Sequence, residues 1–325
     1  MPEMGFGGED IGLGVAEFDD RPTHGWRRLA WNVGLRRVGR SAAEVEYDSL
    51  VAAIQVGLRR PRIIGVMSGC GGSGKTTSAY LLGNAIAEHR TFTATALVSV
   101  DHNGSLARRT IDVSSAAGKA PSPSSIVRFA RESEHFTDSS DVEFHLLKTA
   151  SGLRVLGSSR DTMDPPVTPK EYRIAIERLQ LNNSVILVDF GNTQDSPVFQ
   201  TALASLDALV VVMATESASV RSSVELIEDI YNGAVYGLGS KLRSRTMVIL
   251  NQRSGGRPQK LDFDQVVSRI NNTIEAPPGT SSVVQLPWDD HIALSARINP
   301  EHLGRRTQHQ VLIAAATIMG MLPVA

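Results

Sequence analysis

From residue 62 onward, short hydrophobic runs alternate with longer segments in which apolar residues recur at helical spacing. Two of the short runs, 185–188 and 209–212, are apolar at every position. Half-exposed strands alternate apolar and polar residues, whereas strands buried on both faces of a parallel sheet are apolar throughout. The pattern predicts buried strands at 62–67, 95–101, 153–157, 184–189, 208–213, 246–251 and 283–286.

Helical segments are expected between these strands, at 76–88, 124–132, 169–180, 219–232 and 262–272. Strands that alternate with helices form a parallel sheet that is covered by helices on both faces. We therefore expect an α/β fold with a doubly wound, mostly parallel sheet of about seven strands. Ligands of such sheets bind outside the carboxyl ends of the strands, so polar residues at those ends are the candidates for function.

The N-terminal 61 residues depart from this pattern and change in charge along their length. Residues 1–24 combine six carboxylates with many glycines, which predicts a flexible acidic tail. Residues 25–61 form a basic leader, in which Ser41 and Glu44 are spaced as a capping box that predicts a helix start. Pro61 ends this helical leader, and residues 62–325 make up the α/β domain.

Composition and charge narrow the classes of function. The chain has 325 residues and a formal net charge of −1, so no overall field favours nucleic acid or a membrane. A single cysteine, Cys70, excludes an internal disulfide framework and a cysteine-based zinc site. No secretory signal is visible, and no apolar run approaches the ~18 residues of a membrane span, so we expect a cytoplasmic protein.

The segment from Gly69 to Thr76 reads G-C-G-G-S-G-K-T and matches G-x-x-x-x-G-K-[ST] between a predicted strand and a predicted helix. Glycines let the backbone wrap around phosphate oxygens, towards which backbone N–H groups and the helix N-terminus direct positive charge. Lys75 would bind the outer phosphates and the Thr76 hydroxyl would ligate Mg²⁺. The alternative is a glycine turn with a chance lysine. The expected nucleotide-binding residues in this loop are Gly71, Gly72, Ser73, Gly74, Lys75, Thr76 and Thr77.

Two acidic residues follow predicted strands. Asp189 ends the apolar run 185–188, which is the form of a Walker B element whose carboxylate lies near Mg²⁺. Asp101 ends the strand after the loop helix and is a candidate for orienting an attacking water. Because Asp, Asn and Gly also favour turns, a turn at 101–104 is an equal alternative.

Asn251 ends a further predicted strand, 246–251, and its amide has the paired donor and acceptor that read a base edge. Guanine readers place an aspartate three residues after such an asparagine. Ser254 stands at that position, so adenine is the better match.

With these elements in order, residues 62–325 resemble the ParA/MinD-like P-loop ATPases, whose loop reads K-G-G-x-G-K-[ST]-[ST]. The segments 101–106 and 286–288 are similar to the family's second strand end and late strand end. The resemblance implies that Lys75 and Asp101 are catalytic, that Thr76 and Asp189 hold Mg²⁺, and that Asn251 contacts adenine. The segment 25–29 further resembles actinobacterial MinD-like proteins linked to type VII secretion.

Cys70 departs from this family pattern, because the family has a lysine there that reaches across a dimer to the partner's phosphate. A thiol has neither the reach nor the charge of an ammonium group. We therefore expect slow hydrolysis, with nucleotide binding through Lys75 less affected. Cys70 is either a small tolerated residue or a reactive thiol close to Lys75. In the second case, modification of the Cys70 thiol would block ATP binding.

The basic segment 25–40 leaves several interpretations open. It packs on the domain through its tryptophans, binds an anionic membrane surface, or binds a protein partner. Nucleic acid is the less favoured ligand, because one short patch makes few phosphate contacts. The acidic tail 1–24 would close this patch by pairing with its arginines.

The leading interpretation is a cytoplasmic ATPase, peripheral at the inner face of the membrane if 25–40 binds lipid, that uses ATP and Mg²⁺ as a molecular switch. The resemblance implies a homodimer or a protein partner, and a larger assembly such as a type VII secretion system. The alternatives are a non-hydrolysing nucleotide-binding scaffold, a DNA-segregation ATPase and, less well supported, a small-molecule P-loop kinase.

Overall fold

The computed structural model describes residues 40–100, 106–113, 125–157, 165–191, 196–232, 239–254, 263–274, 282–294 and 297–323. The chain divides into two units, Met1–Ser49 and Leu50–Ala325. Helix α2 (Ala42–Ile54) starts in the first unit, with the predicted capping box. The Glu44 N–H donates to the Ser41 hydroxyl at 3.2 Å, and the Ser41 N–H donates to the Glu44 carboxylate at 2.7 Å. The expected acidic tail and the segment 25–39 lie outside the described residues.

The second unit is built on one eight-stranded sheet in the order β3-β4-β2-β5-β1-β6-β7-β8. Neighbouring strands run parallel, except for the antiparallel edge pair β3 and β4. The central strand β1 lies between β5 and β6. The strands are β1 (Arg62–Met67), β2 (Ala94–Ser99), β3 (Leu147–Lys148), β4 (Arg154–Leu156), β5 (Asn183–Asp189), β6 (Ala208–Ala214), β7 (Thr246–Asn251) and β8 (Val283–Leu286).

All seven predicted strands are present, and the predicted α/β fold with a mostly parallel sheet is confirmed. The eighth strand, β3, has two residues and one exposed side chain, so it carries no hydrophobic run to detect. Strand β6 is buried at every position, as its continuous apolar sequence predicts.

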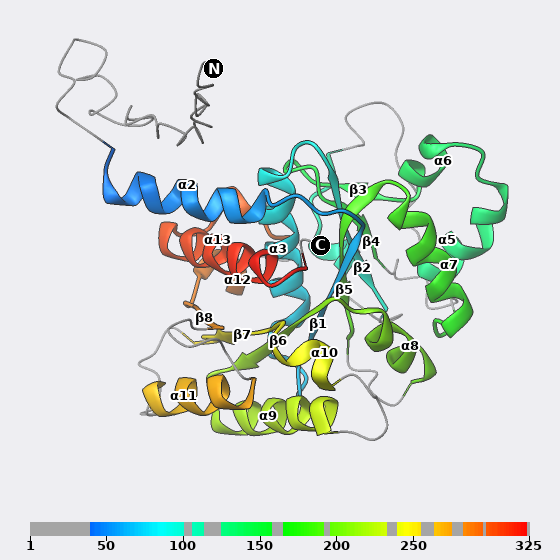
Figure 1. Ribbon diagram of the computed structural model, residues 1–325. Helices are drawn as coiled ribbons and strands as arrows, with labels where there is room; N and C mark the ends of the chain where they lie inside the picture. Colours follow the sequence, from blue (N-terminus) through cyan, green and yellow to red (C-terminus); the bar gives the residue numbers. More distant parts are fainter. Residues whose placement is uncertain are drawn as a thin grey trace, which may run out of the picture. The chain divides into compact units, whose positions relative to one another are not determined.

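Helices cover both faces of the sheet (Figure 1). Leu97 and Leu187 point to one face and Val98 and Val188 to the other, because side chains alternate along a strand. The first face carries α3 (Lys75–His89), α4 (Leu106–Arg109), α12 (Asp290–Leu294), α13 (Arg305–Gly320) and the end of α2. The second carries α5 (Ile126–Glu132), α6 (Ser139–Phe144), α7 (Pro169–Gln180), α8 (Pro197–Ser205), α9 (Ser217–Asn232), α10 (Gly239–Arg243) and α11 (Phe263–Thr273).

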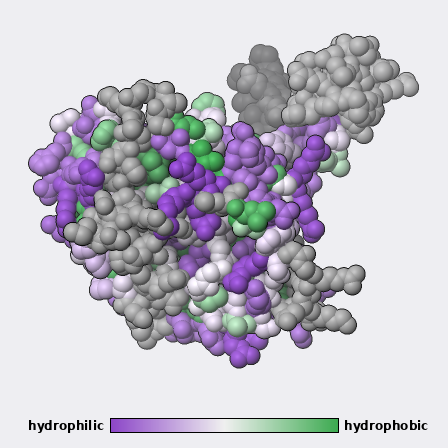
Figure 2. All heavy atoms as spheres, turned by 180° about the vertical axis from the view of Figure 1, so that it is seen from behind, coloured by the Kyte–Doolittle hydropathy of each residue, from purple (hydrophilic) through white to green (hydrophobic). Residues whose placement is uncertain are grey.

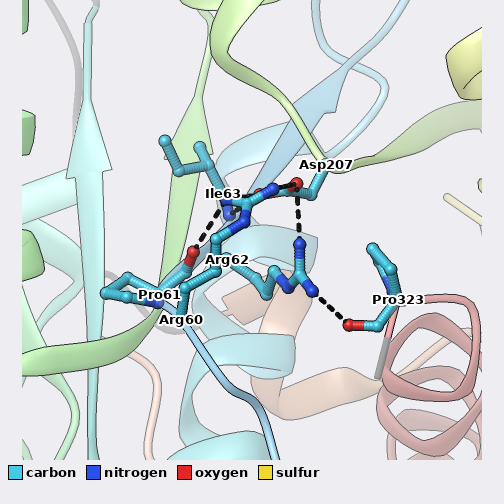
Figure 3. Close-up of polar contacts among 6 residues, drawn as sticks. All are labelled: Arg60, Pro61, Arg62, Ile63, Asp207 and Pro323. Atoms are coloured by element: carbon cyan, nitrogen blue, oxygen red, sulfur yellow. Dashed lines mark hydrogen bonds and ion pairs between the residues drawn. The ribbon is translucent and has the colours of Figure 1, made fainter. Parts of the chain in front are cut away.

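A buried ion pair fixes the amino-terminal end of β1 (Figure 3). Asp207 is 1% exposed and accepts hydrogen bonds from the Ile63 N–H at 3.0 Å and from Arg60 Nη2 at 2.6 Å. Arg62 lies 3.4 Å from the same carboxylate and also donates to the carbonyl of Pro323. Burial of a charge is tolerated when the charge is paired and hydrogen-bonded, as it is here. This cluster joins β1, the residue before β6 and the segment after α13 at one end of the sheet.

Within the described residues, no helix is long and apolar enough to cross a membrane. Among the coloured residues in Figure 2, hydrophilic ones predominate, with small separate groups of hydrophobic residues. Most of the apolar residues of α13 are buried and pack into the core on the α3 face of the sheet.

Candidate functional site

The glycine-rich loop joins the carboxyl end of β1 to the first residue of α3, Lys75. Two of its glycines have the left-handed backbone conformation that side chains disfavour, with φ of +74° at Gly72 and +97° at Gly74. Helix α3 has 15 residues and begins directly after Gly74. The predicted strand–loop–helix context is therefore present, and it directs backbone N–H groups at the start of a helix towards one point.

Helix α9 packs closely against the beginning of the loop. A Cβ atom at Gly69 would lie 2.2 Å from the carbonyl oxygen of Ser222, and the Gly69 N–H donates to the Ser223 hydroxyl at 3.2 Å. The Cys70 thiol lies 3.1 Å from the Ser219 hydroxyl, which also accepts a hydrogen bond from the Ala214 N–H. Only glycine fits at position 69, because the atoms that a side chain would meet are backbone atoms.

The end of β7 supports the other half of the loop. The Asn251 side-chain amide donates to the carbonyl of Ser73 at 2.9 Å, and a Cβ at Gly74 would lie 2.4 Å from that amide nitrogen. Two residues further along, Arg253 Nη1 donates to the carbonyl of Gly72 at 3.1 Å. Two side chains from one strand end therefore hold two successive carbonyl groups of the loop. This contact of Asn251 is additional to the predicted contact with adenine, which stays a prediction.

Thr76 and Asp189 meet at the carboxyl edge of the sheet. The Thr76 hydroxyl donates to Asp189 Oδ2 at 2.7 Å. Asp189 is 1% exposed at the end of β5, whose register pairs it with Val66 of β1. Hydroxyl and carboxylate oxygens are ligands that Mg²⁺ prefers, so these two residues fit the predicted ion. Lys75, only 6% exposed, lies at the base of the same loop.

Two further hydroxyl groups belong to this region and were not predicted to contact a ligand through their side chains. Ser99 ends β2, is 3% exposed, and is paired in register with Asp189. Its hydroxyl, like that of the fully buried Ser73 in the loop, has no hydrogen-bond partner within the described residues. A buried polar group without a partner is unfavourable, so both hydroxyls are candidates for contacts with a ligand or its waters. In the sequence, Ser99 was hidden inside the predicted strand 95–101.

Asp101 follows β2 and lies outside the described residues, so its predicted role in orienting water stays a prediction. Its strand is nevertheless described to Val100, whose N–H donates to the Asp189 carbonyl at 3.0 Å. The chain therefore leaves β2 beside the end of β5.

Comparisons with known proteins agree with this fold. No family model matches the chain. A crystal structure of a ParA family ATPase from Chlorobium tepidum TLS is 19% identical, with a TM-score of 0.59, and the match covers 79% of this chain and 98% of that one. MinD from Pyrococcus horikoshii OT3, solved in complex with Mg-ADP, is 18% identical, with a TM-score of 0.54, over 79% of this chain and 94% of that one. The chain thus has the fold of the ParA/MinD ATPases.

A curated relative gives a more distant link. The ESX-1 secretion-associated protein EspI of Mycobacterium tuberculosis, in strains CDC 1551 and H37Rv, is 26% identical over 297 residues. The match covers 90% of this chain and 42% of EspI, so the chain spans less than half the length of this relative.

Proposed function

We propose that the chain is a Mg²⁺-dependent ATP-binding and hydrolysing switch of the ParA/MinD type. The observation that carries this proposal is the 2.7 Å contact between Thr76 of the phosphate loop and Asp189 of the neighbouring strand. The two expected Mg²⁺ ligands are thus together at the end of the loop, where folds of this kind bind their ligands. The solved complex of the similarly folded P. horikoshii MinD with Mg-ADP supports the choice of nucleotide and ion.

Each residue has a distinct role in this proposal. The backbone N–H groups of 71–77 and the Lys75 ammonium bind the phosphates, and Thr76 and Asp189 hold Mg²⁺. The ion, when bound, neutralises the charge that develops on the phosphates. Asp101 orients the attacking water, and Asn251 contacts adenine.

The biological setting that we propose is support of a type VII secretion system. It follows from the distant relation to EspI and from the resemblance of segment 25–29. In this setting the nucleotide state controls the binding of a second copy or of a protein partner. The basic segment 25–40 is the proposed contact with that partner or with an anionic membrane at its inner face.

A non-hydrolysing scaffold is the second candidate, and Cys70 favours it. The thiol contacts Ser219 of its own chain and carries no fixed charge for a phosphate. A DNA-segregation ATPase would show salt-sensitive, ATP-dependent retention on nonspecific DNA, which the net charge of −1 disfavours.

Calorimetric titration with ATP and Mg²⁺ tests the proposal. The wild type is expected to bind ATP, Lys75→Ala to lose binding, and Lys170→Ala, which removes an exposed lysine of α7, to bind as the wild type does. Single-turnover release of labelled phosphate then separates the switch from the scaffold. The absence of binding by the wild type at millimolar ATP would reject both. Sizing with ATP and with ADP shows whether the nucleotide controls self-association.

A further inference from the structure

The side chain of Arg253 lies against the phosphate loop although it comes from a different strand end. Its Nη1 atom donates to the carbonyl of Gly72 at 3.1 Å and would lie 3.5 Å from a Cβ at that glycine. Its Nε atom lies 3.4 Å from the carboxylate of Glu216, which follows β6. The guanidinium group is therefore held between the loop and a neighbouring carboxylate.

Within the part of the chain that the structure describes, the guanidinium group of Arg253 keeps N–H donors that are available to a ligand. It carries five N–H groups, and the contacts with Gly72 and Glu216 engage it through Nη1 and Nε. The side chain is 43% exposed, and that of Glu216 is 51% exposed, so solvent and ligands reach both. An exposed ion pair contributes little free energy by itself, so it is easily rearranged.

A phosphate is a better partner for this arginine than the carbonyl of Gly72, with which it is now bonded. The planar guanidinium fork matches two phosphate oxygens at once, and charge-assisted bonds of this kind are about twice as strong as neutral ones. The present bond to Gly72 is made to a neutral carbonyl. Lys75 is buried at the base of the loop, and Cys70 carries no fixed charge. Arg253 is therefore a second cation at the loop, on its exposed side.

We propose that Arg253 is a nucleotide-contacting residue that binds the outer phosphates of ATP from within the same chain. Glu216 holds the guanidinium beside the loop and competes with the phosphates for it. This inference rests on the proposed function and extends it, because it assigns a phosphate contact to a residue outside the phosphate loop.

The test compares the affinities of the full chain for ATP, ADP and AMP with Mg²⁺. Arg253→Ala is expected to weaken ATP binding about 10- to 100-fold, ADP binding less, and AMP binding least. Arg253→Lys should recover part of the loss, since it keeps the charge without the fork. Glu216→Gln should strengthen ATP binding, because it removes the competing carboxylate.

The matched control is Arg128→Ala, which removes an arginine that is 45% exposed and paired with Glu132 on α5. It should leave all three affinities unchanged. The inference is overturned if Arg253→Ala binds ATP as the wild type does, or if its affinities for ATP, ADP and AMP decrease by the same factor. An equal loss would mean that the arginine only supports the loop. Lys75→Ala distinguishes failure of this inference from failure of the proposed function. If only the inference about Arg253 is wrong, the wild type still binds ATP and Lys75→Ala still abolishes that binding.

Discussion

Gly74→Ala is the substitution that most directly probes the shape of the phosphate loop. Gly74 has φ of +97°, and a Cβ there would lie 2.4 Å from the side-chain nitrogen of Asn251. Alanine therefore meets two separate obstacles, a disfavoured backbone conformation and a contact too short for any real structure. The second obstacle is relieved only if the Asn251 amide moves away from the carbonyl of Ser73, to which it donates at 2.9 Å.

The two obstacles have different magnitudes. A non-glycine residue in the left-handed region costs about 1–2 kcal/mol. Loss of the hydrogen bond between Asn251 and Ser73 costs about 0.5–1.5 kcal/mol more. We expect Gly74→Ala to lower the free energy of unfolding by roughly 1.5–3.5 kcal/mol, which is the sum of these two effects.

Equilibrium unfolding in urea measures this difference, with Gly152→Ala as the matched control. Gly152 has φ of +87°, but a Cβ added there would meet nothing within 4 Å, so Gly152→Ala should lose only the backbone part, about 1–2 kcal/mol. In an Asn251→Ala background, the loss of unfolding free energy caused by Gly74→Ala should also decrease to about that value, because the short contact with the Asn251 side chain is absent. Equal losses for Gly74→Ala and Gly152→Ala in the wild-type background would refute the contact with Asn251. Unchanged stability and ATP affinity of Gly74→Ala would refute the loop geometry.

Other expectations follow from the same contacts. Asp189→Asn should reduce the Mg²⁺-dependent part of ATP binding and leave binding in EDTA unchanged; equal affinities with and without Mg²⁺ in the wild type would contradict this. Asp207→Ala should lower the free energy of unfolding by about 3–5 kcal/mol, because it removes the carboxylate that pairs with the buried Arg62, and a loss under about 1 kcal/mol in urea would argue against that pair. Complete labelling of Cys70 with a bulky thiol reagent should abolish ATP binding, and ATP should protect the thiol; unchanged affinity of the labelled protein would exclude a thiol-based block.

The hydrophobic pattern was sufficient to predict the sheet, because its strands are buried and continuous. Strand β6 is completely buried, and its apolar sequence shows this without any structure. Strand β3 has two residues, and it pairs with β4 only because the chain turns back at 149–153. Local sequence has no signal for such a pairing.

Residues of the candidate site could be predicted where a short sequence motif identifies them. Thr76 and Asp189 are each recognisable from neighbouring residues, and the parallel sheet brings them together. The contacts of Asn251 with Ser73 and of Arg253 with Gly72 join residues 178 and 181 positions apart. Neither contact has a periodic or local signature, because each depends on where β7 ends relative to the loop.

The two sides of the loop differ in how they can respond to a ligand. On the side of α9, the backbone of Ser222 packs so closely on Gly69 that a Cβ there would lie 2.2 Å from the Ser222 carbonyl oxygen, so we expect little movement of the loop towards this helix. On the side of β7, the loop is held by the side chains of Asn251 and Arg253, which can rotate. In the proposed function we therefore expect the phosphates to be accommodated on the β7 side of the loop, where Arg253 already lies. In the function that we propose, we expect a response to the nucleotide to begin at Arg253 and to reach its ion-pair partner Glu216, which directly precedes α9.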